Sequence, residues 1–197
     1  MDKTYCIFGD SVTHAAYVRN GWVDLLRIYL EDKFPNDFVN VLNLGVGGNT
    51  TNDILSRFES ESAARIPTSL IFAVGVNDSA YIQSIARPIV EEKMFESNLK
   101  KLIDLAVKFS KDIMFIGPVL GNDSILKPLP GGMEDEDWSY DRKRTGNYNN
   151  ILKNIVVSRN CKLIQLLDKL NSEDFEDGLH PNEQGHRKMF EIIKQYF

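Results

Sequence analysis

The chain has 197 residues, of which 43% are hydrophobic, and it carries a formal net charge of -5 with a sequence pI near 5.3. This size suits one domain with one core, and we predict a single domain over residues 1–197. The acidic balance, with no lysine and arginine stripe among aromatic residues, argues against nucleic acid as a partner. Residues 1–4 lead straight into an apolar run, without the apolar core of a signal peptide and without the roughly 18 apolar residues of a membrane span. We therefore expect a cytoplasmic protein with no membrane span.

Five short apolar runs alternate with segments whose apolar residues recur every three or four positions. The runs predict buried strands, and the segments predict amphipathic helices. The predicted strands are residues 5–8, 39–44, 70–74, 113–117 and 163–167, and the predicted helices are residues 22–34, 53–62, 91–110, 148–158 and 183–196. Repeated strand and helix units of this kind form a parallel sheet covered on both faces. We predict an α/β fold, a three-layer α/β/α sandwich around a five-stranded parallel sheet of the flavodoxin-like order 2-1-3-4-5.

The longest irregular stretch of the sequence runs from about residue 117 to residue 146. It contains Pro118, Pro128 and Pro130, an acidic run over residues 133–137 and a basic run over residues 142–144. A loop of this length in a compact domain is either a functional lid or disordered. We take it as a candidate lid that covers a site and selects its ligand, without supplying a group that reacts.

Polar motifs follow four of the predicted strands. They are Gly9–Ser11 after the first strand, Gly45–Asn49 after the second, Gly75–Asp78 after the third, and Asp177–His180 after the fifth. All four lie beyond strand carboxyl ends, where open parallel sheets bind ligands. In the predicted order, strand 1 lies between strands 2 and 3, so we expect Ser11, Gly48 and Asn77 to converge.

Ser11, His180 and Asp177 supply the three groups of a nucleophilic serine site. A serine hydroxyl is a poor nucleophile until an imidazole takes its proton, and the imidazole needs a carboxylate that fixes its tautomer. An Asp-x-x-His segment can fold so that its own carboxylate reaches the ring Nδ1, and Pro181 biases His180 away from helical φ/ψ. We predict that Ser11 is the nucleophile, His180 the proton carrier and Asp177 the group that orients His180.

Acyl transfer to a serine creates an oxyanion, which preorganised hydrogen-bond donors stabilise. Ser11 can offer its own amide, and Asn77 offers an NH2 group without a competing charge. A glycine at position 48 lets a substrate approach the backbone closely, although Gly45 and Gly47 stand near enough to compete for this role. The simplest role of the neighbouring Asp10 is to accept hydrogen bonds from backbone amides of its turn.

With these motifs in this order over nearly its full length, the chain resembles the GDSL, or SGNH, hydrolase family. The resemblance implies that Ser11, Asp177 and His180 are catalytic, and that the amides of Ser11 and Gly48 form an oxyanion hole with the Asn77 side chain. The chain departs from the family name at one position, where Val12 stands in place of leucine, and both side chains are apolar.

Two other classes of site lack their residues in this sequence. Dinuclear metallophosphoesterases need an Asp-x-His block and several further histidines, but the chain has three His in all and no Asp-x-His. A dinucleotide site needs G-x-G-x-x-G after the first strand, whereas these glycines follow the second. Cys6 and Cys161 are far apart and are predicted to be free thiols. We therefore predict no cofactor and no metal.

We predict a serine esterase, lipase-like in family, that cleaves an ester of a small acyl group through an acyl-enzyme. Its partner is a small-molecule ester, and an acetyl group on a sugar, a short-chain ester, a lysophospholipid and a thioester all fit. One alternative is an acyltransferase, which passes the acyl group to another hydroxyl instead of water. A second alternative is a non-catalytic glycan-binding or peptide-binding protein of the same fold, against which the presence of Ser11, Asp177, His180 and Asn77 argues.

Overall fold

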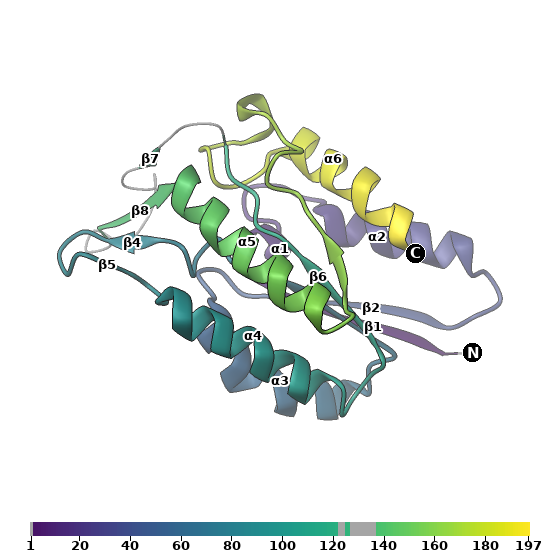
Figure 1. Ribbon diagram of the computed structural model, residues 1–197. Helices are drawn as coiled ribbons and strands as arrows, with labels where there is room; N and C mark the ends of the chain where they lie inside the picture. The colour runs from purple at the N-terminus through teal and green to yellow at the C-terminus, as the bar shows by residue number, and fades with distance from the viewer. Residues whose placement is uncertain (1, 122–124, 127–136) are drawn as a thin grey trace.

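The computed structural model describes residues 2–121, 125–126 and 137–197 (Figure 1). Its strands are β1 (Lys3–Gly9), β2 (Val39–Gly45), β3 (Ser69–Ala73), β4 (Tyr81–Ile82), β5 (Arg87–Pro88), β6 (Asp112–Ile116), β7 (Ile125–Leu126), β8 (Trp138–Asp141) and β9 (Lys162–Ile164). Its helices are α1 (Ser11–His14), α2 (Trp22–Lys33), α3 (Thr51–Arg65), α4 (Glu92–Ala106), α5 (Arg142–Ser158) and α6 (Glu183–Ile193), with short 3-10 helices η1 (Ser172–Asp174) and η2 (Lys194–Tyr196).

The main sheet has the strand order β2-β1-β3-β6-β9, and every pair is parallel. This order confirms the predicted flavodoxin-like sheet. The carboxyl ends of the three strands on one side of the sheet are aligned, because Gly9 pairs with Gly45 and Phe8 pairs with Phe72. The loops that carry three of the four polar motifs therefore leave the sheet at one edge.

Helices cover both faces of this sheet (Figure 1). Side chains alternate along β1, so that Ile7 packs with α2 and α6 while Phe8 packs with α3, α4 and α5. Both of these side chains are fully buried, and burial of such a side chain contributes about 1.5–3 kcal/mol. The Phe8 ring also stacks on Phe72, with ring centroids 5.6 Å apart. The chain thus forms the predicted three-layer sandwich, with one apolar cluster on each side of the sheet.

A second, smaller sheet corrects the prediction for residues 117–146. Its strand order is β5-β4-β8-β7, and β8 lies within the stretch that was predicted to be irregular. Helix α5 also begins at Arg142 and not at residue 148, because Asp141 caps it by accepting a hydrogen bond from the Arg144 amide at 2.8 Å. Residues 122–124 and 127–136 of the candidate lid lie outside the described residues.

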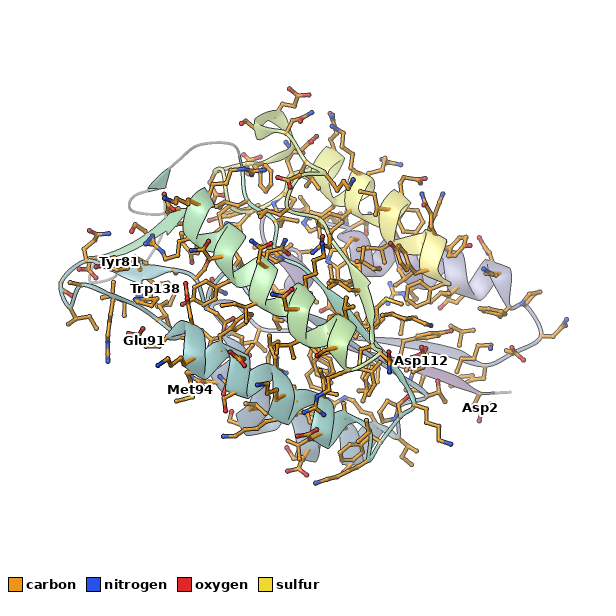
Figure 2. The ribbon with its side chains drawn as sticks, viewed as in Figure 1. Asp2, Tyr81, Glu91, Met94, Asp112 and Trp138 are labelled. Carbon is orange, nitrogen blue, oxygen red and sulfur yellow. The ribbon has the colours of Figure 1, made fainter. Side chains whose placement is uncertain are left out.

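The small sheet lies at one end of the molecule. Figure 2 shows Tyr81 of β4 and Trp138 of β8 at the opposite end from Asp2 and Asp112, which mark the amino ends of β1 and β6. The small sheet is therefore at the carboxyl end of the parallel strands, the end that carries the polar motifs. Within the described part of the chain, no helix is long and apolar enough to cross a bilayer.

Candidate active site

Ser11 is the first residue of α1, directly beyond the end of β1. Asp10 precedes it as the helix N-cap, and its carboxylate accepts a hydrogen bond from the Val12 amide at 2.9 Å. This bond confirms the role expected for Asp10. Because Ser11 opens the helix, its own N–H has no acceptor within α1. Burial raises the pKa of Asp10 to about 6.

The Asp177–His180 segment folds back on itself as the spacing predicted. One carboxylate oxygen of Asp177 lies 2.7 Å from Nδ1 of His180, and the other accepts from the backbone amides of Leu179 at 2.9 Å and His180 at 2.7 Å. Burial by itself raises the pKa of Asp177, but these bonds from His180 and Leu179 outweigh it and hold the pKa below its ordinary value. The carboxylate therefore stays ionised and fixed in one orientation.

The structure brings Ser11 and His180 together across 169 residues of sequence. Ser11 Oγ lies 2.9 Å from His180 Nε2. An ionised Asp177 only accepts, so the hydrogen on the ring belongs on Nδ1, and Nε2 is left to accept the hydroxyl proton of Ser11. The three side chains form one continuous hydrogen-bonded chain, in which His180 is 9% exposed.

The structure distinguishes Gly45 from Gly48, two of the glycines that could fill one role in the turn after β2. A Cβ on Gly45 would lie 2.4 Å from the His14 nitrogen, so this glycine allows the turn to pack on α1. Gly48 has a φ of +76°, and the space in front of its Cα is open. The backbone at Gly48 is therefore accessible and held in a conformation that favours glycine, as its predicted role requires.

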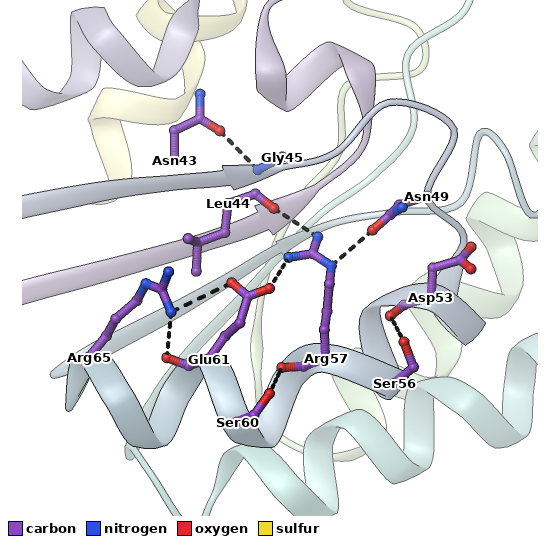
Figure 3. A network of polar contacts seen from close by, with 10 residues as sticks. All are labelled: Asn43, Leu44, Gly45, Asn49, Asp53, Ser56, Arg57, Ser60, Glu61 and Arg65. Carbon is purple, nitrogen blue, oxygen red and sulfur yellow. Dashed lines mark hydrogen bonds and ion pairs between the residues drawn. The ribbon is translucent and has the colours of Figure 1, made fainter.

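Arg57 of α3 holds this turn in place (Figure 3). Its guanidinium donates to the Asn49 side-chain oxygen at 2.9 Å and to the Leu44 carbonyl at 2.8 Å. A third donation, to Glu61 at 2.9 Å, anchors the guanidinium on its own helix. Arg57 was not predicted from the sequence, because a charged residue on an amphipathic helix usually belongs to the solvated face.

Asn77 lies beyond the end of β3 with its side chain buried and hydrogen-bonded at both polar atoms. Its Nδ2 donates to the Asn49 carbonyl at 3.1 Å, and its Oδ1 accepts from the Tyr140 hydroxyl at 2.9 Å. Asp78 accepts instead from the amide and hydroxyl of Thr51, at the start of α3, so it is a structural neighbour of the motif. Tyr140 was not among the predicted residues.

Together these groups suit acyl transfer. A serine hydroxyl is hydrogen-bonded to an imidazole, a carboxylate fixes that imidazole, and Gly48 and Asn77 lie on loops that leave the same edge of the sheet. Among the described residues, no group of three or more His, Cys, Asp or Glu side chains is arranged to hold a metal ion.

Comparison with known proteins agrees with this reading. Residues 7–188 match the family model described as the GDSL-like lipase/acylhydrolase family. An acetylxylan esterase of Geobacillus stearothermophilus is 22% identical over an alignment of 202 positions, which covers 90% of this chain and 86% of that protein.

Two solved structures resemble this one over nearly its whole length. The crystal structure of Axe2, an acetylxylan esterase from Geobacillus stearothermophilus, has a TM-score of 0.76 at 20% identity and covers 98% of this chain and 93% of its own. LAE5, an α/β hydrolase from the metagenome of Lake Arreo in Spain, has a TM-score of 0.75 at 20% identity and covers 97% and 93%. Structures of Axe2 described as catalytic mutants replace a serine, an aspartate and a histidine.

Proposed function

Because the chain belongs to the GDSL-like lipase/acylhydrolase family and is a carboxylic ester hydrolase, we propose that Ser11, His180 and Asp177 carry out its reaction. The observation that carries this proposal is the hydrogen-bonded chain from Ser11 Oγ through His180 to Asp177, with distances of 2.9 and 2.7 Å. A serine, an aspartate and a histidine are also the residues replaced in the catalytic mutants of Axe2.

In the acylation step, Ser11 Oγ attacks the ester carbonyl carbon while its proton passes to His180 Nε2. The tetrahedral intermediate then collapses, the bond to the alcohol oxygen breaks, and His180 returns the proton to the leaving alcohol. Water repeats the sequence on the acyl-enzyme and releases the carboxylic acid and free Ser11. Asp177 keeps the ring oriented and stabilises its positive charge in both halves of the reaction.

The negative charge of the tetrahedral intermediate needs donors that are in place before the reaction. We assign this role to the amides of Ser11 and Gly48 and to the Nδ2 group of Asn77. One Nδ2 hydrogen of Asn77 is engaged by Asn49, which leaves the second to point at the oxyanion. Loss of one such donor typically lowers kcat by about 10²- to 10³-fold.

For the substrate, we propose an acetyl or other short acyl ester on a sugar. The acetylxylan esterase relative, which aligns over 90% of this chain, supports an acetylated carbohydrate. The ring of Tyr17 supports it as well: it packs edge-on against His180 with centroids 5.1 Å apart and is 62% exposed, so an aromatic surface lies beside the catalytic histidine. We also propose that the protein is cytoplasmic and that its reaction needs neither a metal nor a cofactor.

A substrate panel tests this function. Purified protein is assayed on p-nitrophenyl esters from acetate to octanoate and on acetylated xylooligosaccharides, with Ser11→Ala as the matched control. We expect acetate release from the oligosaccharides, a kcat/KM that falls with acyl length, and no turnover by the control above background. A preference for octanoate, or no release of acetate from the sugar, would overturn the proposed substrate class. Turnover by Ser11→Ala would overturn the proposed mechanism.

A further inference from the structure

Tyr140 reaches the site from outside the main sheet. It lies on β8 of the small sheet, is 1% exposed, and donates its hydroxyl to Asn77 Oδ1 at 2.9 Å. The two residues are 63 positions apart in the sequence. The tyrosine therefore connects the small sheet to the loop that carries a proposed oxyanion donor.

The partners of Asn77 determine which way its amide faces. The Asn49 carbonyl can only accept, so the amide atom beside it must be the NH2 group. The other amide atom is then the oxygen, which accepts from the Tyr140 hydroxyl. A rotation of the amide by 180° would place two oxygens together at Asn49, so the two bonds select one orientation and leave one N–H free of these partners.

We propose that Tyr140 is a positioning residue for the oxyanion hole: its hydroxyl holds the Asn77 amide so that the remaining N–H faces the developing oxyanion. This proposal rests on the proposed function, in which Asn77 is an oxyanion donor. In this role, Tyr140 acts through its hydrogen bond to Asn77 and not on the reacting atoms. Donors that are already oriented require no reorganisation during the reaction, which is why their fixation raises kcat.

Further contacts fix the same two segments to each other. Arg144 Nε donates to the Ser79 carbonyl at 2.8 Å, and the hydroxyls of Thr145 and Ser79 are 2.9 Å apart. Both Ser79 and Thr145 are fully buried. Because these bonds join the start of α5 to the loop after β3, the β8 strand that precedes α5 is held at a fixed distance from Asn77. Under this proposal, residues 117–146 contribute a positioning residue, which the sequence did not predict.

The test uses Tyr140→Phe, Asn77→Ala and the double variant, assayed on p-nitrophenyl acetate. Tyr140→Phe keeps the ring and removes only the hydroxyl, and we expect kcat to fall about tenfold or more with KM within about twofold, because the lost effect appears in the transition state. In the Asn77→Ala background, we expect removal of the Tyr140 hydroxyl to change kcat by less than about twofold, because the Asn77 amide that this hydroxyl positions is already absent.

Tyr148→Phe is the matched control. Tyr148 is equally buried, at 1% exposure, and its hydroxyl donates to the Val90 carbonyl and not to Asn77. We expect this variant to keep kcat within about twofold. If Tyr140→Phe loses its native thermal transition, kcat of Tyr140→3-fluorotyrosine is followed with pH on p-nitrophenyl acetate, because fluorine makes the phenol more acidic and the proton that it donates to Asn77 is lost at a lower pH. A fall of kcat at high pH that the wild type does not show, and that is absent in the Asn77→Ala background, supports the proposal, whereas a pH profile that coincides with that of the wild type overturns it.

The outcomes separate this inference from the proposed function. Wild-type kcat in Tyr140→Phe, or an equal fall in the wild-type and Asn77→Ala backgrounds, overturns the role of Tyr140 while Asn77 keeps its own. Wild-type kcat in Asn77→Ala overturns the assignment of Asn77 and the inference together. Turnover by Ser11→Ala overturns the proposed function itself.

Discussion

The substitution Asp177→Asn should change the tautomer of His180 without unfolding the segment that holds the ring. The Asp177 carboxylate makes three hydrogen bonds: Oδ1 accepts from the amides of Leu179 and His180, and Oδ2 accepts from the His180 ring. Asparagine can keep the first two bonds with its Oδ1. Its NH2 group, however, takes the place of Oδ2 and can only donate to the ring, so Nδ1 must accept and the ring hydrogen moves to Nε2. In this state, His180 cannot take the proton of Ser11.

We expect Asp177→Asn to lower kcat strongly but to change the free energy of unfolding little. The corresponding substitution in a Ser-His-Asp triad lowers kcat by about 10⁴-fold, which corresponds to a barrier higher by roughly 5.5 kcal/mol. The two backbone bonds survive, so the free energy of unfolding should change by about 1 kcal/mol or less. Asp177→Ala is the contrasting variant, because it also leaves two amides without their acceptor and should cost about 1–3 kcal/mol more.

The assay measures p-nitrophenyl acetate hydrolysis at neutral pH together with urea unfolding for the wild type and both variants. We expect the two variants to be similarly inactive but to differ in their unfolding midpoints. A kcat for Asp177→Asn within tenfold of the wild type would mean that Asp177 does not set the tautomer of His180.

Two further predictions concern packing and titration. Gly45→Ala should lower the free energy of unfolding by about 1–3 kcal/mol, because the new Cβ would lie 2.4 Å from the His14 nitrogen. In Gly47→Ala the new Cβ meets nothing within 4 Å, so the free energy of unfolding should change by no more than about 0.5 kcal/mol. Urea unfolding measures both variants, and equal effects would contradict the packing described for the turn. Burial lowers the pKa of His186 from 6.5 to about 4. Between these pH values the unfolded state therefore binds more protons than the folded state. The free energy of unfolding should fall as pH drops from 6.5 to 4, by about 3 kcal/mol in total. His186→Gln, which has no ring to protonate, should show a flatter loss of stability over that pH range in urea titrations, and an unchanged slope would rule out His186 as its source.

Much of the fold and of the triad could be predicted because the signals are local. The central strands β1, β3 and β6 are largely buried on both faces and appear as continuous apolar runs, such as Tyr5 to Phe8. The pairing of Asp177 with His180 follows from a spacing of three residues, and Ser11 follows a strand end that the predicted sheet order places nearby. These inferences need only the sequence pattern and the geometry of a parallel sheet.

The sequence carries no comparable local signal for the small sheet or for the contact between Tyr140 and Asn77. Strands β4, β5 and β7 are two residues long and β8 is four, too short for a visible alternation of apolar and polar residues. Helix α5 begins with Arg142, Lys143 and Arg144, and positive charge at a helix amino terminus is unfavourable, so its first turn did not look helical. The bond from Tyr140 to Asn77 depends on a contact across 63 residues, which no local pattern encodes.

Covalent labelling shows whether Ser11 is the nucleophile. The wild type and Ser11→Ala are incubated with a fluorophosphonate, and the adduct is located by peptide mass spectrometry while residual esterase activity is followed. We predict one adduct, on Ser11, that forms at the same rate as activity is lost, and no adduct in Ser11→Ala. An adduct on another residue that accompanies inactivation, or undiminished hydrolysis by Ser11→Ala, would contradict this prediction.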